Sequence, residues 1–278
     1  MKVAFIGAGT MAEAIIKAVL KKKILNKEDI LVSDILPHRL DSLHQEYGIT
    51  GAVDNEQAAA KADLVILSVK PQNLHDISAD LSRILNSRQT VASIMAGVSI
   101  ATLERSLKHQ SIVRIMPNTP AQIGAGMSVW TATKPVPKQV VEQIKGILKT
   151  LGEEIYVKEE KYVDMATAVS GSGPAFMFLI IEALVDAGVH IGLPRDTAKM
   201  LAVQTALGSS LLVKETGKHT SELKDMVSSP GGTTVEGLLE LEKGQVKADL
   251  IRAVTAAYQK SLKLAEAASQ QNEGKGQQ

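Results

Sequence analysis

Short apolar runs alternate with helical patterns along the first part of the chain. The runs of strand length are KVAFIG, DILVSD, ADLVILSV, QTVASIMAG and QSIVRIMP, and segments with helical spacing separate them. In ADLVILSV almost every position is apolar, as in strands that are buried on both faces of a parallel sheet. A final helix and strand follow in PVPKQVVEQIKGILKTLG and EEIYVKE. This alternation predicts an α/β fold with a doubly wound parallel sheet.

From about residue 161 the pattern predicts helices alone. Pro174 and Pro194 stand near the starts of two of them, where proline is favoured. Apolar residues such as Val185, Leu207 and Leu211 cover more than one helical face. We therefore expect this part to complete its core on a second copy of the chain, with packing on its own sheet domain as the alternative.

These patterns divide the chain into three parts. We expect a dinucleotide-binding domain of the Rossmann type at 1–160 and a helical dimerisation and substrate domain at 161–270. The polar residues 271–278 are expected to be a disordered tail.

Composition narrows the possible functions. The 278 residues carry a net charge of +1 and only 3% aromatic residues, which argues against a nucleic-acid partner. The absence of cysteine excludes disulfides and thiolate chemistry, and no histidine spacing suits a metal, so no metal site is expected. The most apolar segment, PAFMFLIIEALVDAGVHIGL, is interrupted by Glu182, Asp186 and His190. Its uncharged run is shorter than the roughly 20 residues of a membrane span. We therefore expect a cytoplasmic protein with no membrane partner.

The first strand ends in GAGTMA, which has the spacing of a dinucleotide-binding turn. Gly7 permits a tight turn, Gly9 allows a pyrophosphate to approach the backbone, and Ala12 lets the helix lie close to the sheet. The free N–H groups of the helix N-terminus then face the phosphates. The turn predicts a nicotinamide dinucleotide as cofactor.

Further candidates lie where other predicted strands end. Asp34 ends the second strand, where a carboxylate binds ribose hydroxyls and disfavours a 2′-phosphate, although it could also cap the following helix. His38 and Arg39 follow and could neutralise such a phosphate, so NADH and NADPH both remain open, with Asp34 favouring NADH. The loops SVKPQN, MAGVS and MPNTPAQIGAG end later strands and are expected to line the site.

The segments AVSGSGPAF and LKDMVSSPGGTTVEGLLELE resemble pyrroline-5-carboxylate reductase, as do FIGAGTMAEAI, SVKPQ and RIMPNTP. The resemblance spans nearly the whole chain. It implies reduction of the C=N bond of 1-pyrroline-5-carboxylate to L-proline with NADPH or NADH. It also implies homodimers, often assembled into larger rings, with the active site at the dimer interface. Asp34 departs from the small hydroxyl or basic residues that many members carry there to accept a 2′-phosphate.

The resemblance also implies a set of site residues. Those for the cofactor are Gly7, Ala8, Gly9, Thr10, Met11, Ser33, Asp34, Asn55, Val69, Lys70, Pro71, Ala96 and Gly97. Those for the substrate are Ser228, Ser229, Gly231, Gly232, Thr233 and Thr234, in the loop SSPGGTT.

The chemistry of SSPGGTT suits an imino acid. Backbone N–H groups without side chains can close on a carboxylate at a helix N-terminus. Thr234 is the candidate catalytic residue, since its hydroxyl can donate to the imine nitrogen. Thr233 could instead cap the helix, and the whole loop could be only a turn and a cap.

Other functions stay open on the residues alone. The same fold could serve a reductase of another cyclic imine or a β-hydroxyacid dehydrogenase. The latter is expected to carry a lysine in its first interdomain helix, which SGSGPAFMFLIIEALVDAG lacks. A dinucleotide-binding sensor without catalysis is the alternative of another class.

Overall fold

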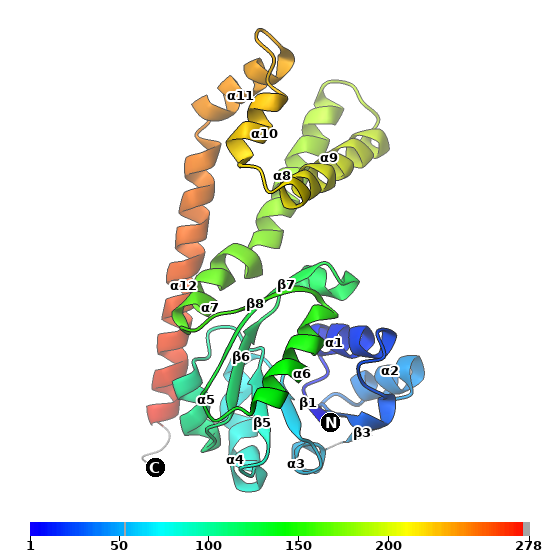
Figure 1. Cartoon of the computed structure of the whole chain (residues 1–278), viewed down its shortest axis with the longest axis vertical. Coiled ribbons are helices and arrows are strands. Elements are labelled where there is room, and N and C mark those ends of the chain that lie inside the picture. Colours follow the sequence, from blue (N-terminus) through cyan, green and yellow to red (C-terminus); the bar gives the residue numbers. More distant parts are fainter. Residues whose placement is uncertain (53, 275–278) are drawn as a thin grey trace. The chain divides into compact units, whose positions relative to one another are not determined.

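The structure is a computed structural model that describes residues 1–52 and 54–274. Its sheet has the strand order β3-β2-β1-β4-β5-β6-β7-β8 (Figure 1). The strands are β1 (Val3–Ile6), β2 (Ile30–Ser33), β3 (Gly51–Ala52), β4 (Leu64–Leu67), β5 (Thr90–Ser93), β6 (Ile112–Met116), β7 (Gly126–Ala132) and β8 (Gly152–Tyr156). The chain order of the strands reverses between β1 and β4, as in a Rossmann-type sheet, and the predicted fold class is confirmed.

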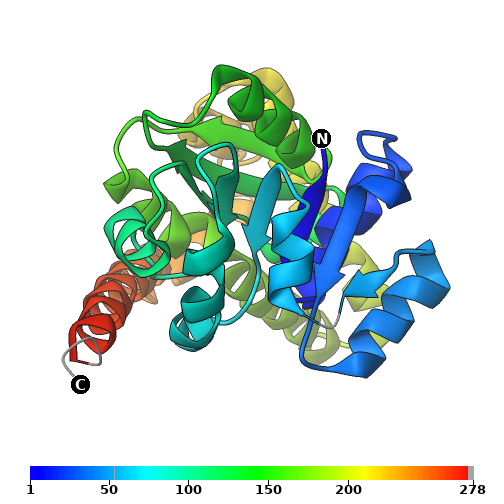
Figure 2. The ribbon, with the colours of Figure 1, turned by 90° about the horizontal axis from the view of Figure 1, so that it is seen from below.

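Alternate residues of the central strands feed two separate cores. Val3 and Phe5 of β1 pack into one core, while Ala4 and Ile6 pack into the other, because successive side chains point to opposite faces. The helices that cover the faces are α1 (Thr10–Lys21), α2 (Pro37–Tyr47), α3 (Asn55–Ala60), α4 (Leu74–Ile84), α5 (Ile100–Leu107) and α6 (Lys138–Lys149). Helices α1 and α6 cover one face and α3, α4 and α5 the other (Figure 2). Both faces of the parallel sheet are therefore buried, as ADLVILSV predicted.

The far side of the sheet differs from the prediction. Strand β7 pairs antiparallel with β6, and β8 runs parallel to β7. No strand is expected over GMSVWTA from the sequence. In the structure Trp130 of this strand is buried and donates from Nε1 to Glu154 Oε2 of β8 at 2.8 Å. The sheet is mixed rather than wholly parallel.

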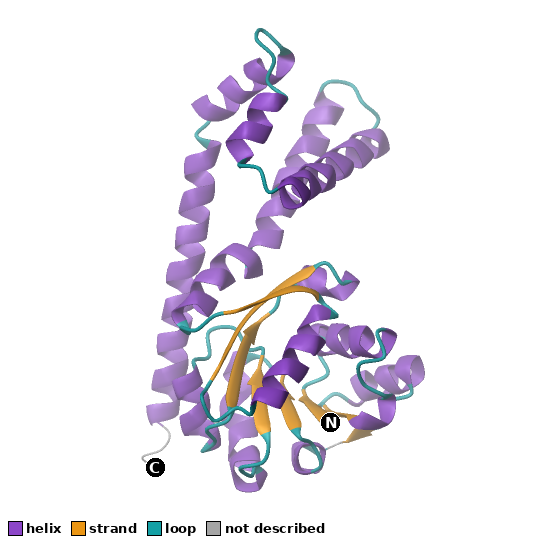
Figure 3. Ribbon diagram, in the orientation of Figure 1, coloured by secondary structure: helices purple, strands orange, loops and turns teal. Residues whose placement is uncertain are grey.

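The chain divides into two compact units, one formed by Met1–Ser172 with Ala256–Gln278 and one by Gly173–Thr255. Between residues 173 and 255 the structure holds only helices and loops (Figure 3). The later helices are α7 (Lys161–Ala166), a π-helical turn (Thr167–Gly171), α8 (Gly173–His190), α9 (Arg195–Thr216), α10 (Thr220–Met226), α11 (Thr233–Lys243) and α12 (Val246–Gly274). Short 3-10 turns lie at Lys27–Asp29, Pro71–Asn73 and Thr119–Ile123.

Helix α12 departs from the predicted domains. From Ala256 onward it belongs to the sheet unit, whereas the sequence analysis placed it wholly in the helical domain. Helix α12 packs closely on the loop after β5, because a Cβ added at Gly97 would lie 3.0 Å from Leu264 Cβ. The helix also runs to Gly274, into the predicted tail, and residues 275–278 lie outside the described part.

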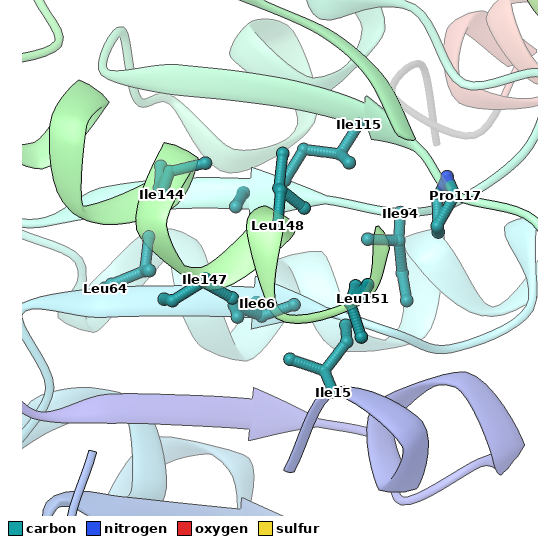
Figure 4. Close-up of a pocket in the computed structure, with 11 residues that line it drawn as sticks. Ile15, Leu64, Ile66, Ile94, Ile115, Pro117, Ile144, Ile147, Leu148 and Leu151 are labelled. Atoms are coloured by element: carbon teal, nitrogen blue, oxygen red, sulfur yellow. The ribbon is translucent and has the colours of Figure 1, made fainter. Parts of the chain in front are cut away.

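One core cavity lies between the sheet and the helices α1 and α6. It measures about 10 Å³ and is lined by Ile15, Ile66, Ile144, Leu148, six further apolar residues and Pro117, all drawn as sticks in Figure 4. A space of this size without polar lining is a packing defect rather than a ligand site.

Candidate functional site

The turn after β1 has the geometry that a pyrophosphate needs. Gly7 has a φ of +100°, and an added Cβ would lie 3.0 Å from the carbonyl of Ser68 and from Val69 Cγ1. Gly9 is the N-cap of α1 and is exposed, and a Cβ there would meet only Ser68 O at 4.0 Å. Gly7 is thus required by the protein itself, while Gly9 leaves open space above the helix N-terminus. These features fit a dinucleotide phosphate.

The end of β2 is tied to this turn by side chains. Asp34 accepts from the N–H of Ala8 at 2.6 Å and from the N–H of Leu36 at 2.9 Å. The N-cap of α2 is Leu36, so Asp34 is not the cap of that helix. Buried Ser33 donates to Asn55 Oδ1 at 2.6 Å. The carboxylate therefore stands beside the turn, where cofactor ribose would lie.

The side chain of Arg39 already has partners within the protein. Its guanidinium donates to Ala8 O at 2.9 and 2.7 Å and forms an ion pair with Glu13 at 2.6 Å. From the sequence, Arg39 and His38 are expected to be able to neutralise a 2′-phosphate. In the structure Glu13 balances that charge, while His38 is exposed.

The remaining predicted cofactor residues follow the next two strands. Val69, Lys70 and Pro71 come after β4, and Ala96 and Gly97 come after β5. The strands β2, β1, β4 and β5 are parallel neighbours, so their carboxyl ends form one edge. Ser68 Oγ donates to Gly7 O at 2.7 Å and joins two of these loops directly. The fold thus brings the predicted cofactor residues to one edge of the sheet.

The loop Ser228–Thr234 lies in the helical unit. Gly231 has a φ of +68°, and a Cβ at Gly232 would lie 2.6 Å from Ser229 Oγ. Gly232 is the N-cap of α11 and has no side-chain cap, so Thr233 begins the helix and does not cap it. Thr234 is half-buried, and its hydroxyl has no hydrogen bond within the described residues. Ser228 Oγ donates to Lys224 O at 2.8 Å, so the proton of this hydroxyl is already engaged.

A buried charge cluster beside the sheet escaped the sequence analysis. Arg114 of β6 is 2% exposed and pairs with Glu160 at 2.6 Å and Asp164 at 2.5 Å. Glu160 Oε1 also accepts from the N–H of Ile100 at 2.7 Å. Burial alone would lower the pKa of Arg114, but bonding and charge from Asp164 and Glu160 outweigh it and raise the pKa above its usual value. The sequence signal for this cluster is an arginine inside an apolar strand, because a buried charge needs a partner of opposite charge.

Comparisons with known proteins decide the family. Residues 160–264 match the model for pyrroline-5-carboxylate reductase dimerisation, and 2–97 match that for NADP oxidoreductase, coenzyme F420-dependent. The pyrroline-5-carboxylate reductase of Synechocystis sp. is 42% identical over 95% of this chain and 98% of that protein. This chain belongs to the pyrroline-5-carboxylate reductase family. It is an NAD(P)-dependent oxidoreductase, and the recognised resemblance is confirmed.

Further relatives of the family agree. The Escherichia coli pyrroline-5-carboxylate reductase is 38% identical over 95% of this chain and 98% of its own. The solved Coxiella burnetii enzyme superposes with a TM-score of 0.88 at 34% identity, and covers 95% of this chain and 98% of its own. The Plasmodium falciparum enzyme, solved with NADP bound, has a TM-score of 0.87 at 33% identity with the same two coverages.

The most apolar segment is longer than the sequence analysis expected. The helical residues 161–190 are long and apolar enough, by length and composition alone, to cross a membrane. The expectation rested on the uncharged run, which is shorter than the helix. The match to the dimerisation model covers all of this segment.

Proposed function

We propose that this chain reduces the C=N bond of 1-pyrroline-5-carboxylate to give L-proline. The observation that carries the proposal is that one chain holds two sites with complementary chemistry. The glycine turn after β1 suits a dinucleotide, and the loop Ser228–Thr234 suits a small anionic imine. Family membership with near-complete coverage supports the same reaction over the alternatives.

The substrate loop would act through backbone groups first. Helix α11 begins at Thr233, and Val235 N already donates to Gly232 O at 3.1 Å. The N–H groups of Thr233 and Thr234 have no acceptor within the helix. They carry the positive end of the helix dipole and would bind the substrate carboxylate. The bend at Gly231 and the bare Cα of Gly232 let the anion approach the backbone.

Thr234 would act on the imine. Its hydroxyl has no partner among the described residues and is therefore available to the imine nitrogen. An imine takes its proton from water before reaction, so the protein needs to orient the ring rather than supply a strong acid. When bound, the nicotinamide supplies the hydride. The residues Gly7 to Met11, Ser33, Asp34, Asn55, Val69 to Pro71, Ala96 and Gly97 would hold that cofactor.

We infer a preference for NADH over NADPH. Asp34 adds a negative charge at the ribose position, and the positive charge of Arg39 is balanced by Glu13. A 2′-phosphate would meet net repulsion there. The NADP of the Plasmodium falciparum structure belongs to that enzyme and is the reason to compare both cofactors directly.

We propose that the working form is a homodimer that lies in the cytoplasm, with residues 161–270 as the dimerisation and substrate region. The large apolar side chains of α8 and α9 would pack on a second copy rather than in a membrane. The dimerisation match over 160–264 supports this occupant.

The direct test is oxidation of NADH and NADPH with 1-pyrroline-5-carboxylate, measured side by side. We expect turnover with both and a larger kcat/KM with NADH. A larger kcat/KM with NADPH would overturn the preference alone. Folded protein that binds dinucleotide but shows no turnover with either would overturn the reaction.

The role of Thr234 has its own test. We expect Thr234→Ala to lower kcat/KM by roughly tenfold to a thousandfold, the range for loss of one donor at a preorganised site. Thr220→Ala is the matched control, because it removes the same hydroxyl from an exposed position in the first turn of α10, outside the substrate loop. The affinity for NADH should hold in both variants. Equal kcat/KM values for the two variants would contradict the assignment of the Thr234 hydroxyl to the imine nitrogen.

A further inference from the structure

Pro174 is the second residue of α8, where its missing N–H costs that helix nothing, but it follows the π-helical turn within the helical stretch 161–190. In an α-helix the carbonyl of Ser170 accepts from the N–H of residue 174, and Pro174 has no N–H. The preceding turn is already irregular, since Ser172 N donates to Thr167 O, five residues back, at 2.9 Å. Such π-helical turns occur often at functional sites.

The sheet supplies the missing donor. Asn118, just beyond the end of β6, donates from Nδ2 to the carbonyl of Ser170 at 3.0 Å. Its Oδ1 accepts from the N–H of Met127, at the start of β7, at 2.8 Å. One partner can only donate and the other can only accept, so the chemistry fixes the orientation of the amide.

The segment Ser170–Ser172, to which Asn118 is hydrogen-bonded, carries only small side chains, which offer little surface for packing. An added Cβ at Gly171 would lie 3.1 Å from Met116 Cε, so the backbone passes close to the end of β6. Asn118 and Gly171 thus attach the segment at two adjacent points to the carboxyl edge of the sheet, the edge that holds the proposed cofactor residues.

We propose that Asn118 is a positioning residue for the reduction. Its amide replaces the N–H that Pro174 lacks and fixes the backbone of Ser170–Ser172 at the carboxyl edge. This inference rests on the proposed function, since the geometry that it protects is that of hydride transfer. A misplacement of about 1 Å costs an enzyme roughly a hundredfold in rate.

The first test is Asn118→Asp, which keeps the shape and the acceptor for Met127 but turns a carboxylate oxygen toward the carbonyl of Ser170. We expect kcat with NADH and 1-pyrroline-5-carboxylate to fall by about tenfold to a hundredfold. The Kd for NADH, measured by calorimetry, should stay within about twofold, because the side chain of Asn118 is hydrogen-bonded to Ser170 and Met127, neither of which is a proposed cofactor residue.

Thr133→Val is the matched control. Thr133 also bridges two backbone groups, as it accepts from Ile112 N at 3.0 Å and donates to Gln110 O at 2.6 Å. Thr133 follows the last residue of β7, opposite the amino end of β6 and away from the carboxyl edge of the sheet. We expect a comparable loss of thermal stability with kcat unchanged. A similar fall in kcat for both variants would reduce Asn118 to a structural role and overturn the inference.

A mutant cycle tests the link to proline. Pro174→Ala restores an N–H at position 174. Asn118→Ala should therefore cost about tenfold in kcat when Pro174 is present and less than threefold in the Pro174→Ala background. Equal costs in both backgrounds would overturn the inference. If Pro174→Ala fails to fold, the comparison of Asn118→Asp with Thr133→Val decides. Absence of turnover in the unmodified enzyme would instead count against the proposed function.

Discussion

The two compact units bury their apolar residues to very different degrees. The sheet unit closes two cores in which side chains such as Phe5, Leu64 and Trp130 are fully buried. In the helical unit the buried apolar cluster consists of Val185, Ala198 and Ala202, while Phe178 and Leu179 are 62% and 65% exposed. A sheet covered by helices on both faces completes its core within one chain. Helices that are apolar all around need a further surface.

The largest effect should come from the exposed face of α8. We expect Phe178→Glu combined with Leu179→Glu to weaken self-association by roughly a hundredfold to ten-thousandfold, since each buried side chain is worth about 1.5–3 kcal/mol. Light scattering across a dilution series measures the change.

Ile123→Glu is the control for that variant, because Ile123 is 83% exposed but lies in the sheet unit. It should leave association unchanged. A double variant that associates as tightly as the original chain would show that the helical unit completes its core elsewhere.

The buried ion pairs of the sheet unit should give the next effect. We expect Asp164→Ala to lower the free energy of unfolding by about 3 kcal/mol, because Arg114 would keep a buried charge with one partner lost. Denaturant titration at fixed protein concentration measures it.

Asp249→Ala breaks an ion pair with Arg252 that is more than half exposed, in the helical unit. Its cost should stay below about 1 kcal/mol. An equal loss of unfolding free energy in Asp164→Ala and Asp249→Ala would contradict the expectation that burial makes the ion pair of the sheet unit the stronger one.

The smallest effect concerns α12, where it belongs to the sheet unit. The hydroxyl of Ser261 is buried without a partner in the described part of the chain. We expect Ser261→Ala to raise the free energy of unfolding by up to about 1 kcal/mol. Ser210→Ala, at an exposed position of α9, should change it by less than about 0.5 kcal/mol. Destabilisation by Ser261→Ala would indicate that a second copy binds this hydroxyl.

The sequence alone predicted the features that depend on short-range pattern. The apolar runs located β1, β2, β4, β5, β6 and β8, and GAGTMA predicted a tight turn that Gly7 realises with a positive φ. The pattern of SSPGGTT placed a bend before a helix, although the cap is Gly232 rather than Thr233. These features are local because they follow from spacing and from the freedom of glycine.

Only the tertiary structure decided the pairings between distant segments. β7 is not predicted from the sequence, and in the structure it pairs with β6 and β8 on either side. Arg114 finds its carboxylates about fifty positions away, and Arg39 is drawn to Glu13 rather than left free. Asn118 meets Ser170 across a similar distance in sequence. Such contacts depend on the direction in which each side chain leaves its strand or helix, and local pattern does not encode which distant group it will meet.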